Sequence, residues 1–479
     1  MSAKQGNTSG TLVWFRRDLR LRDNPAWYEA VRREAPIYPV FLPDDPGEEN
    51  WSPGSASRWW LHHALTDLDQ QLRELGSRLL FRRGEPATAL RSLIREVGID
   101  LVLWNRVYEP EPLSRDTTLR DAVLKAGAEV RISNASLLLE AWTIQSSSGE
   151  GYRVYTPFRK AVLSQKTFAE PLPKPGSPSV PAKWPKSESL ASLALLPRIP
   201  WDKGIAAAWN PTRQGALERL RHFFGNPVRD YAEARDYPDH DGTSRLSPYL
   251  HFGQIGPREI AARIALESMG KGREIFLHEI LWREFAHHVL FHAPASPAEP
   301  LRENFRRFPW RKDADDLRVW QRGETGYPLV DAGMRQLWKT GWLHNRVRMV
   351  VASFLVKHLL ISWREGAAWF WDTLVDADLA SNTLGWQWAA GCGADAAPYF
   401  RIFNPIIQSE KFDSAGDYIR RHVPELAQLP APWIHRPWEA SRECLCEAGV
   451  QLGKDYPYPR IDHKKARQRA LDALASISG

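Results

Sequence analysis

The chain has 479 residues, of which 43% are hydrophobic, and this content is enough to build folded cores and excludes an intrinsically disordered protein. No apolar run approaches the ~20 residues needed to cross a bilayer, and the polar N-terminus lacks the apolar centre of a secretion signal. The three cysteines exclude a four-cysteine iron–sulfur site and a paired disulfide framework. We therefore expect a cytoplasmic protein with more than one domain.

The formal net charge is +7, and it is unevenly distributed along the chain. Residues 1–140 contain 19 Lys and Arg against 20 Asp and Glu, whereas the remaining residues contain 45 against 37. The positive excess therefore belongs to the C-terminal part. Such an excess favours a polyanionic partner such as DNA or RNA, although many basic proteins bind no nucleic acid.

The first 140 residues alternate between short apolar runs and longer stretches with helical spacing. This alternation predicts an α/β domain with a five-stranded parallel sheet of the doubly wound type. Ligands of such sheets bind beyond the carboxyl ends of the strands. The dinucleotide fingerprint G-x-G-x-x-G is missing after the first run, and the chain has no P-loop. The predicted strands are 11–15, 36–42, 78–81, 99–104 and 128–132.

The composition changes twice after this region. Residues 141–210 contain segments rich in Ser, Pro and Gly, which predict a long connection over the surface. Residues 211–479 repeatedly carry apolar residues at i, i+3, i+4 and i+7, and this spacing predicts a larger, all-helical domain. The sequence therefore divides into an α/β domain at 1–140, a linker at 141–210 and a helical domain at 211–479.

Three polar clusters lie at helical spacing within the predicted helical domain. Polar groups at such positions need partners, so they are either satisfied core groups and helix caps or the walls of a buried polar ligand site. Three clusters in one domain favour the ligand site. The clusters are Glu279, Trp282 and Arg283; Asn345 and Met349 with Arg346 beside them; and Asp378, Asn382 and Trp386.

Residues 242–253 read GTSRLSPYLHFG and predict a helix start, because hydroxyl groups cap free amides and proline fits the first turn. Exposed amides and hydroxyls also suit a phosphate group. The motif is weak on its own, since Ser and Thr caps are common where no ligand binds.

The chain contains 22 tryptophans, and we expect core packing to explain most of them. Trp386 and Trp388 are two positions apart, so on a helix of roughly 3.6 residues per turn they point about 200° apart and cannot serve one face. Indole can also stack on bases and pass on an electron. Trp386 and Trp388 could therefore serve two different functions on two sides of the helix.

Five stretches, in the same order and over nearly the whole chain, resemble the photolyase/cryptochrome flavoproteins: LVWFRRDLRLRDNPAW, TSRLSPYLHFG, EILWREF, TGYPLVDAGMRQLWKTGWLHNRVRMVVASFL and WQWAAGCGADAAPYFRIFNP. The resemblance implies an α/β antenna domain, a connector and an all-helical domain that holds FAD bent into a U. Phe276 stands where relatives often carry Trp, and Arg348 would pair with Asp376. The resemblance places at the flavin Tyr231, Thr243, Ser244, Arg245, Leu246, Ser247, Phe276, Glu279, Arg283, Arg348, Asp376, Ala377, Asp378 and Asn382.

The resemblance also separates repair enzymes from light sensors, residue by residue. Asn382 matches the position that faces flavin N5, where plant photoreceptors carry Asp, and a neutral amide tolerates an anionic reduced flavin. Trp282 and Trp388 match two indoles that cradle a flipped-out pyrimidine dimer, and signalling relatives typically lose one or both. Met349 stands where (6-4) photolyases place a histidine. These positions imply repair of cyclobutane pyrimidine dimers.

The implied reaction is a one-electron transfer from light-excited reduced FAD to a dimer flipped out of UV-damaged DNA, catalysed by a monomeric carbon–carbon lyase. Trp386, Trp363 and Trp310 would form the chain that reduces the flavin in light. Glu279 would hydrogen-bond the dimer carbonyl and, with Asn345, stabilise the charge that develops on the dimer. Basic residues would hold the DNA backbone without reading its sequence.

A second, antenna chromophore is also implied, and its identity is open. The stretch WSPGSASRWWLHHAL resembles class III photolyases and plant cryptochromes, which favours 5,10-methenyltetrahydrofolate bound near Trp51. The stretch NRVYEPEPLSRD departs from the folate-contact pattern of class I enzymes at Glu111 and Pro112. A deazaflavin and an empty site remain alternatives.

Two other functions fit parts of the same sequence. One is a blue-light-sensing cryptochrome without repair activity, which a partner-binding tail would favour, but no long extension follows the last motif. The other is a nucleic-acid-binding helical protein with a vestigial flavin. The colour of the purified protein and a repair assay in light and darkness would separate the three functions.

Overall fold

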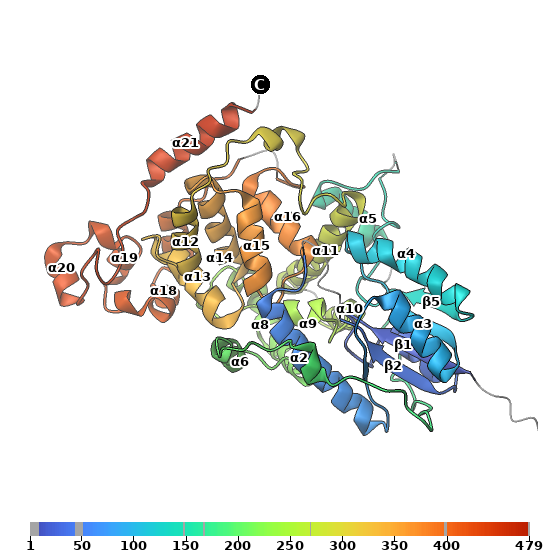
Figure 1. The fold of residues 1–479 in the computed structure, drawn as a ribbon. Coiled ribbons are helices and arrows are strands. Elements are labelled where there is room, and N and C mark those ends of the chain that lie inside the picture. Colours follow the sequence, from blue (N-terminus) through green and yellow to red (C-terminus); the bar gives the residue numbers. More distant parts are fainter. Residues whose placement is uncertain are drawn as a thin grey trace, which may run out of the picture.

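The computed structural model of the chain describes residues 9–43, 51–146, 149–165, 168–268, 270–396 and 400–477. Figure 1 shows a smaller part built around a sheet and a larger helical part that lie against each other. Within the described ranges, no helix is both long and apolar enough to span a membrane.

The N-terminal part is a parallel sheet of five strands with the order β3-β2-β1-β4-β5. The central strands β1 and β4 are buried almost throughout, as expected for strands covered on both faces. All five predicted strands are confirmed, and their bounds are β1 (Gly10–Phe15), β2 (Ile37–Phe41), β3 (Leu80–Phe81), β4 (Ile99–Asn105) and β5 (Glu129–Ser133). The helices between them are α1 (Pro25–Arg32), α2 (Ser55–Glu74), α3 (Pro86–Val97) and α4 (Pro110–Lys125).

From residue 211 onward the described residues form helices and turns, with no strand longer than an isolated bridge, as predicted. The first helices are α7 (Arg213–Gly225), α8 (Pro227–Ala234), α9 (Ser247–His251), α10 (Pro257–Ala265), α11 (Lys271–His292) and η2 (Glu303–Arg307). The middle ones are α12 (Ala314–Arg322), α13 (Pro328–Thr340), α14 (Asn345–Ser353), η3 (Phe354–His358), α15 (Trp363–Thr373) and α16 (Leu379–Ala390). The last are α17 (Pro405–Phe412), α18 (Asp417–His422), η4 (Pro424–Leu426), α19 (Ala431–Ile434), η5 (Pro437–Glu439), α20 (Arg442–Glu447) and α21 (His463–Ala475).

The predicted linker at 141–210 contains three short helices within its long connection. It contains α5 (Tyr155–Ser164), η1 (Leu190–Leu193) and α6 (Lys203–Ala208). Helix α5 buries three side chains and places Phe158 against Phe285 of α11, with ring centroids 5.2 Å apart. Apolar residues at helical spacing inside a Pro- and Ser-rich region account for this packing.

Helix α14 does not continue as a regular α-helix beyond Ser353. After α14 the backbone widens into the π-helix η3, in which the amide of Leu359 donates to the carbonyl of Phe354, five residues earlier. Leu360 then takes a positive φ of 55°, and the helix ends. Such π-turns are frequent near functional sites.

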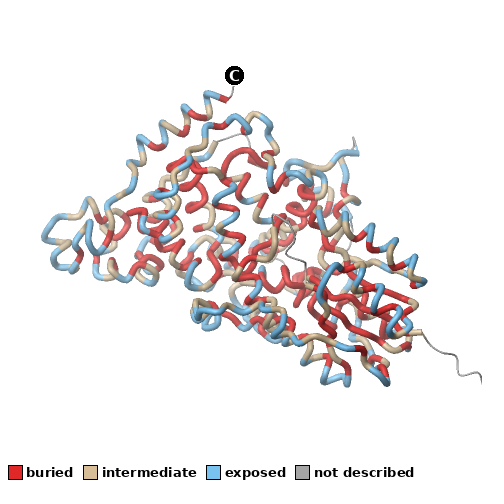
Figure 2. Tube along the Cα trace, viewed as in Figure 1, coloured by how far each residue is buried: buried red, intermediate tan, exposed pale blue. Residues whose placement is uncertain are grey.

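The core is continuous between the two parts of the molecule. Figure 2 shows the buried residues gathered along the sheet and along the central helices, with exposed residues on the outside. Arg20 is fully buried at the junction, where it donates to the carbonyls of Gly253 and Ala135, each at 2.8 Å. A buried guanidinium satisfied by carbonyls from both parts fixes their relative position.

Candidate functional site

Helix α11 carries the first predicted polar cluster on one face. The Glu279 carboxylate accepts a hydrogen bond from Nη1 of Arg235 at 2.6 Å. Burial raises the pKa of Glu279, and the positive charge of Arg235 opposes part of that rise. Arg283, one turn further, donates to the carbonyl of Ser136 at 2.6 Å and so ties α11 to the segment that follows the sheet.

Asp376 is a buried carboxylate shared by two predicted site residues. Nη2 of Arg348 lies 2.8 and 3.0 Å from its two oxygens, which confirms the predicted pair. The hydroxyl of Ser247 donates to the same carboxylate at 2.6 Å. The three side chains come from α14, α9 and the turn before α16, so they join helices that are far apart in the sequence.

The predicted hydroxyl caps at the start of α9 are confirmed only in part. Leu246, which has no polar side-chain group, occupies the N-cap position, and the Ser247 hydroxyl is directed to Asp376; the amide of Leu246 donates to Oγ of Ser244 at 3.4 Å. Pro248 does lie in the first turn, as predicted.

The loop before α9 leaves backbone donors free. In the described part of the chain, the amides of Thr243, Ser244 and Arg245 make no hydrogen bond to protein groups, while their neighbour Arg219 holds the carbonyls of Thr243 and Ser244. Arg245 has a positive φ of 51°, and its guanidinium lies 4.9 Å from the Trp342 ring centroid. Successive free amides beside hydroxyls and a cation form a cradle of the kind that binds phosphate groups.

Asp378 is buried between two histidines that the sequence did not single out. Its Oδ2 lies 3.6 Å from Nδ1 of His251 and 3.5 Å from Nε2 of His287. Burial acts to raise the pKa of Asp378, but His287, His251 and Arg283 outweigh it and hold the pKa well below the usual range. Burial also lowers the pKa of His287 to about 4. Asp378 additionally caps α16 by accepting from the amide of Ser381, so it precedes the helix rather than lying within it.

Helix α16 separates its two indoles, as predicted. Trp386 is buried, with its ring edge-on to Phe370 at 4.9 Å and to Trp320 at 6.1 Å. Trp388 is half-buried and lies 6.5 Å from the ring of Phe403. Asn382, one turn before Trp386, donates to the carbonyl of Ala367 at 3.0 Å. The two indoles therefore face different surroundings.

The other two members of the predicted tryptophan chain lie at the start of α15 and in the segment between η2 and α12. Trp363 is the buried first residue of that helix, and Trp310 is half-buried against Phe308, with ring centroids 4.3 Å apart. The amide of Arg311 donates to the carbonyl of Leu360 at 2.7 Å. This bond brings the segment of Trp310 beside the residues that lead into Trp363.

The remaining predicted residues divide between an exposed edge and a buried aromatic group. Asn345 is the exposed first residue of α14, and Met349 is half-buried one turn later. Arg346 donates to Asp236 at 2.6 Å. Phe276 and Tyr231 pack edge-on, with centroids 5.5 Å apart, and Leu246 and Ala377 are also buried.

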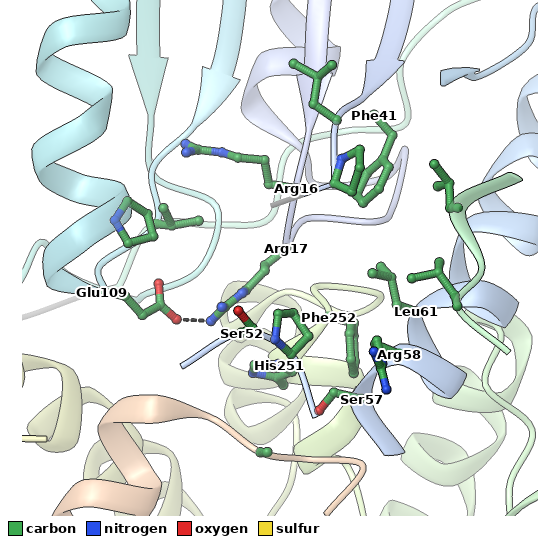
Figure 3. A pocket seen from close by; sticks show the side chains of 18 of the residues that line it. Arg16, Arg17, Phe41, Ser52, Ser57, Arg58, Leu61, Glu109, His251 and Phe252 are labelled. Carbon is green, nitrogen blue, oxygen red and sulfur yellow. Dashed lines mark hydrogen bonds and ion pairs between the residues drawn. The ribbon is translucent and has the colours of Figure 1, made fainter. Parts of the chain in front are cut away.

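A cavity of about 450 Å³ lies at the carboxyl ends of the strands, where they meet the helical part. Figure 3 shows it between the sheet and the helices, with Arg17 directed at Glu109, its ion-pair partner. Leu61, Phe252 and His251 come from the helices on its other side. The lining combines a broad apolar surface with several arginines, which suits a flat ligand that carries negative charge.

The fold and these groups define a two-domain protein whose helical domain is built to hold a phosphate-bearing cofactor. Comparison with known families gives the class directly: residues 11–178 match the DNA photolyase family, and residues 276–476 match the FAD binding domain of DNA photolyase. The chain belongs to the photolyase/cryptochrome family.

Three relatives place the chain within this family. It is 48% identical to the deoxyribodipyrimidine photo-lyase of Agrobacterium fabrum, over 98% of both chains. It is 38% identical to cryptochrome-1 of Arabidopsis thaliana, over 98% of this chain and 71% of that protein. The crystal structure of a bacterial class III photolyase from Agrobacterium tumefaciens superimposes with a TM-score of 0.96, at 47% identity and over 99% of both chains.

Proposed function

We propose that the protein repairs cyclobutane pyrimidine dimers in DNA with the energy of light. The observation that carries the proposal is the presence of two half-buried indoles, Trp282 and Trp388, on the packed helices α11 and α16. The Glu279 carboxylate lies on the same face of α11 as Trp282. Stacking on two such rings stabilises an extruded base by about 1–3 kcal/mol per base.

The helical domain fits FAD by the chemistry of its donors. The free amides of Thr243, Ser244 and Arg245 would hold the phosphates, and the Arg348–Asp376 pair with Ser247 would fix the adjoining wall. The remaining flavin contacts stay as the resemblance assigns them. When bound in its reduced form, FAD would supply one electron on light excitation and would take it back once the cyclobutane ring has opened.

The chain's own residues position the substrate and the charge. Trp282 and Trp388 would stack on the extruded dimer, and Glu279 would hydrogen-bond a dimer carbonyl; burial raises the pKa of Glu279, and its pairing with Arg235 opposes part of that rise. We assign Asn345, with Arg346 and Met349 on the same helix, to the exposed edge of the proposed dimer site. Trp386, Trp363 and Trp310 carry electrons inward from the surface.

The cavity at the strand ends is the proposed site of the antenna chromophore. Trp51 lies edge-on to Trp371 at 5.4 Å, and Trp371 lines the cavity together with Pro112. This placement supports a chromophore near Trp51, and 5,10-methenyltetrahydrofolate stays the favoured identity over a deazaflavin. A cytoplasmic, monomeric enzyme that binds damaged DNA through its backbone completes the proposal.

A light sensor without repair activity is the second candidate, because cryptochrome-1 of Arabidopsis thaliana matches nearly the whole chain. Asn382 and the intact pair Trp282 and Trp388 favour repair over this alternative. The deciding experiment incubates the flavin-loaded protein with an oligonucleotide that contains one thymine dimer, under blue light and in darkness. Repair in light alone is expected; no repair in either condition would favour the sensor, and repair in darkness would contradict the mechanism.

A further inference from the structure

One face of Trp282 is covered by a tyrosine from the connector. The ring of Tyr155, the first residue of α5, lies parallel to Trp282 at an angle of 11°, with centroids 3.7 Å apart. This is the shortest centroid distance between aromatic rings in the described residues. Tyr155 is buried while Trp282 is half-buried, so the tyrosine backs the indole from the protein side.

Tyr155 is fixed at both ends. Its hydroxyl donates to the carbonyl of His278 at 2.8 Å, and His278 lies one helical turn before Trp282 on α11. Its backbone amide donates to Oδ1 of Asp395 at 3.1 Å. A tyrosine ring held by its hydroxyl and its backbone has little freedom to tilt. The Trp282 ring stacked on it is therefore also restricted in its tilt.

Asp395 connects this assembly to the second indole. It follows α16 by five residues and Trp388 by seven, and its amide donates to the carbonyl of Arg153 at 3.0 Å. Because Val154 gives α5 no side-chain cap, the Asp395 carboxylate supplies that cap from another part of the chain. Asp395 does so at a positive φ of 53°, a conformation that is uncommon for non-glycine residues, although aspartate tolerates it better than most.

We propose that Tyr155 and Asp395 are positioning residues that fix the plane of Trp282 and its distance from Trp388, so that a dimer meets a preformed slot. The proposal rests on the proposed function, in which these two indoles receive the dimer. With Tyr155 against one face, Trp282 presents only its opposite face to a base. When the slot is already ordered, the tryptophan side chains lose little conformational entropy on binding the dimer, and that loss would otherwise oppose binding.

The test compares Tyr155→Leu with Tyr155→Phe, which keeps the ring and loses the hydroxyl. The dissociation constants for dimer-containing and undamaged oligonucleotides are measured in darkness by fluorescence anisotropy, beside flavin content and the rate of flavin photoreduction. Tyr155→Leu is expected to weaken dimer binding about ten-fold, while binding of undamaged DNA, flavin content and photoreduction stay unchanged. Tyr155→Phe is expected to stay within about three-fold of the wild type, because the stacked ring remains.

Phe158→Leu is the matched control, since Phe158 docks the same helix on Phe285 without stacking on Trp282. It should lower thermal stability and leave the preference for dimer DNA intact. Asp395→Gly tolerates the positive φ but removes the carboxylate, and it should reproduce part of the Tyr155→Leu loss, whereas Asp395→Asn should restore the preference through its amide oxygen.

The experiment distinguishes failure of the positioning role from failure of the proposed repair function. If the wild type prefers dimer DNA and Tyr155→Leu keeps that preference, or if Phe158→Leu loses it equally, the positioning role is overturned while the repair function stands. If the wild type itself neither prefers nor repairs dimer DNA, the proposed function fails, whatever the variants do.

Discussion

Gly366 of α15 lies against the indole of Trp386: a Cβ atom added at this glycine would fall within 3.0 Å of three of the ring carbons. The ring is rigid and buried, so it could not yield without moving α16. The absence of a side chain at position 366 is therefore what lets Trp386 occupy its place between the two helices.

Gly366→Ala is expected to displace Trp386 and slow photoreduction of the flavin, with overpacking that lowers stability by about 1–3 kcal/mol. Gly385→Ala on α16 is the control, because its Cβ would meet nothing within 4 Å, and alanine in a helix is favoured by about 0.5–1 kcal/mol. Time-resolved flavin absorption and thermal unfolding measure both effects. Normal photoreduction in a fully stable Gly366→Ala protein would contradict the packing described for Trp386.

Arg348→Met is expected to leave the Asp376 carboxylate buried with Ser247 as its remaining side-chain donor. Removing one partner of a buried ion pair typically destabilises by roughly 3–5 kcal/mol, and here the loss should appear as weaker retention of FAD. The ratio of flavin to protein absorbance after dialysis measures it. The double variant Arg348→Met with Asp376→Asn should recover part of the stability, and no recovery would argue against the pair as the cause.

Glu284 predicts a pH dependence of stability. Burial raises the pKa of this carboxyl to about 7, and Arg283 and the amides of Leu138 and Leu139 oppose only part of the rise. The folded protein then binds one more proton than the unfolded chain between the ordinary glutamate pKa and pH 7. The contribution of Glu284 to the free energy of unfolding is therefore complete at low pH and is lost as the pH rises through 7.

The side chain of Glu284→Gln does not titrate, so the variant does not lose stability as the pH rises. The free energy of unfolding of the variant, relative to that of the wild type, should therefore rise between pH 5 and pH 8 by up to about 3 kcal/mol. Chemical unfolding at several pH values measures the difference. Glu447→Gln, at an exposed position of α20, is the control and should show no such trend. A constant difference at Glu284 across this pH range would contradict the raised pKa.

Leu61→Trp is expected to fill the cavity at the strand ends, because Leu61 lines it from α2. The purified variant should lose any absorption band of a second chromophore and keep its FAD, so repair should fall in dim light and recover at saturating light. Leu61→Met, of similar volume, should behave as the wild type. Retention of the band in Leu61→Trp would place the antenna elsewhere.

The fold could be predicted from local pattern because each strand and helix carries its own periodicity. The five apolar runs before residue 140 and the helical spacing after 211 needed no knowledge of the partners that cover them. The local pattern is less informative where tertiary contacts decide the outcome. Helix α5 forms inside a Pro- and Ser-rich region because Phe158 and its neighbours pack on α11, and the helical spacing does not reveal that the π-helix η3 follows α14.

The candidate site divides in the same way. Residues within long motifs, such as Trp282 and Asn382, could be assigned from the sequence through the resemblance. Tyr155, Arg235 and His251 were missed, because each acquires its role from a partner far along the chain, at Trp282, Glu279 and Asp378. For Tyr155 and Arg235 the only sequence signal was an aromatic or charged residue in an otherwise ordinary segment, whereas His251 lies in the motif of residues 242–253 and received no role there.

The role of Trp282 in holding the dimer is tested by measuring repair of a thymine dimer by Trp282→Ala with its FAD retained and chemically reduced. Chemical reduction bypasses Trp386, so Trp386→Phe serves as the control that should still repair under light. Trp282→Ala is expected to keep its flavin spectrum and lose repair. Undiminished repair by this variant would show that the dimer is held elsewhere and would overturn the proposed role of Trp282.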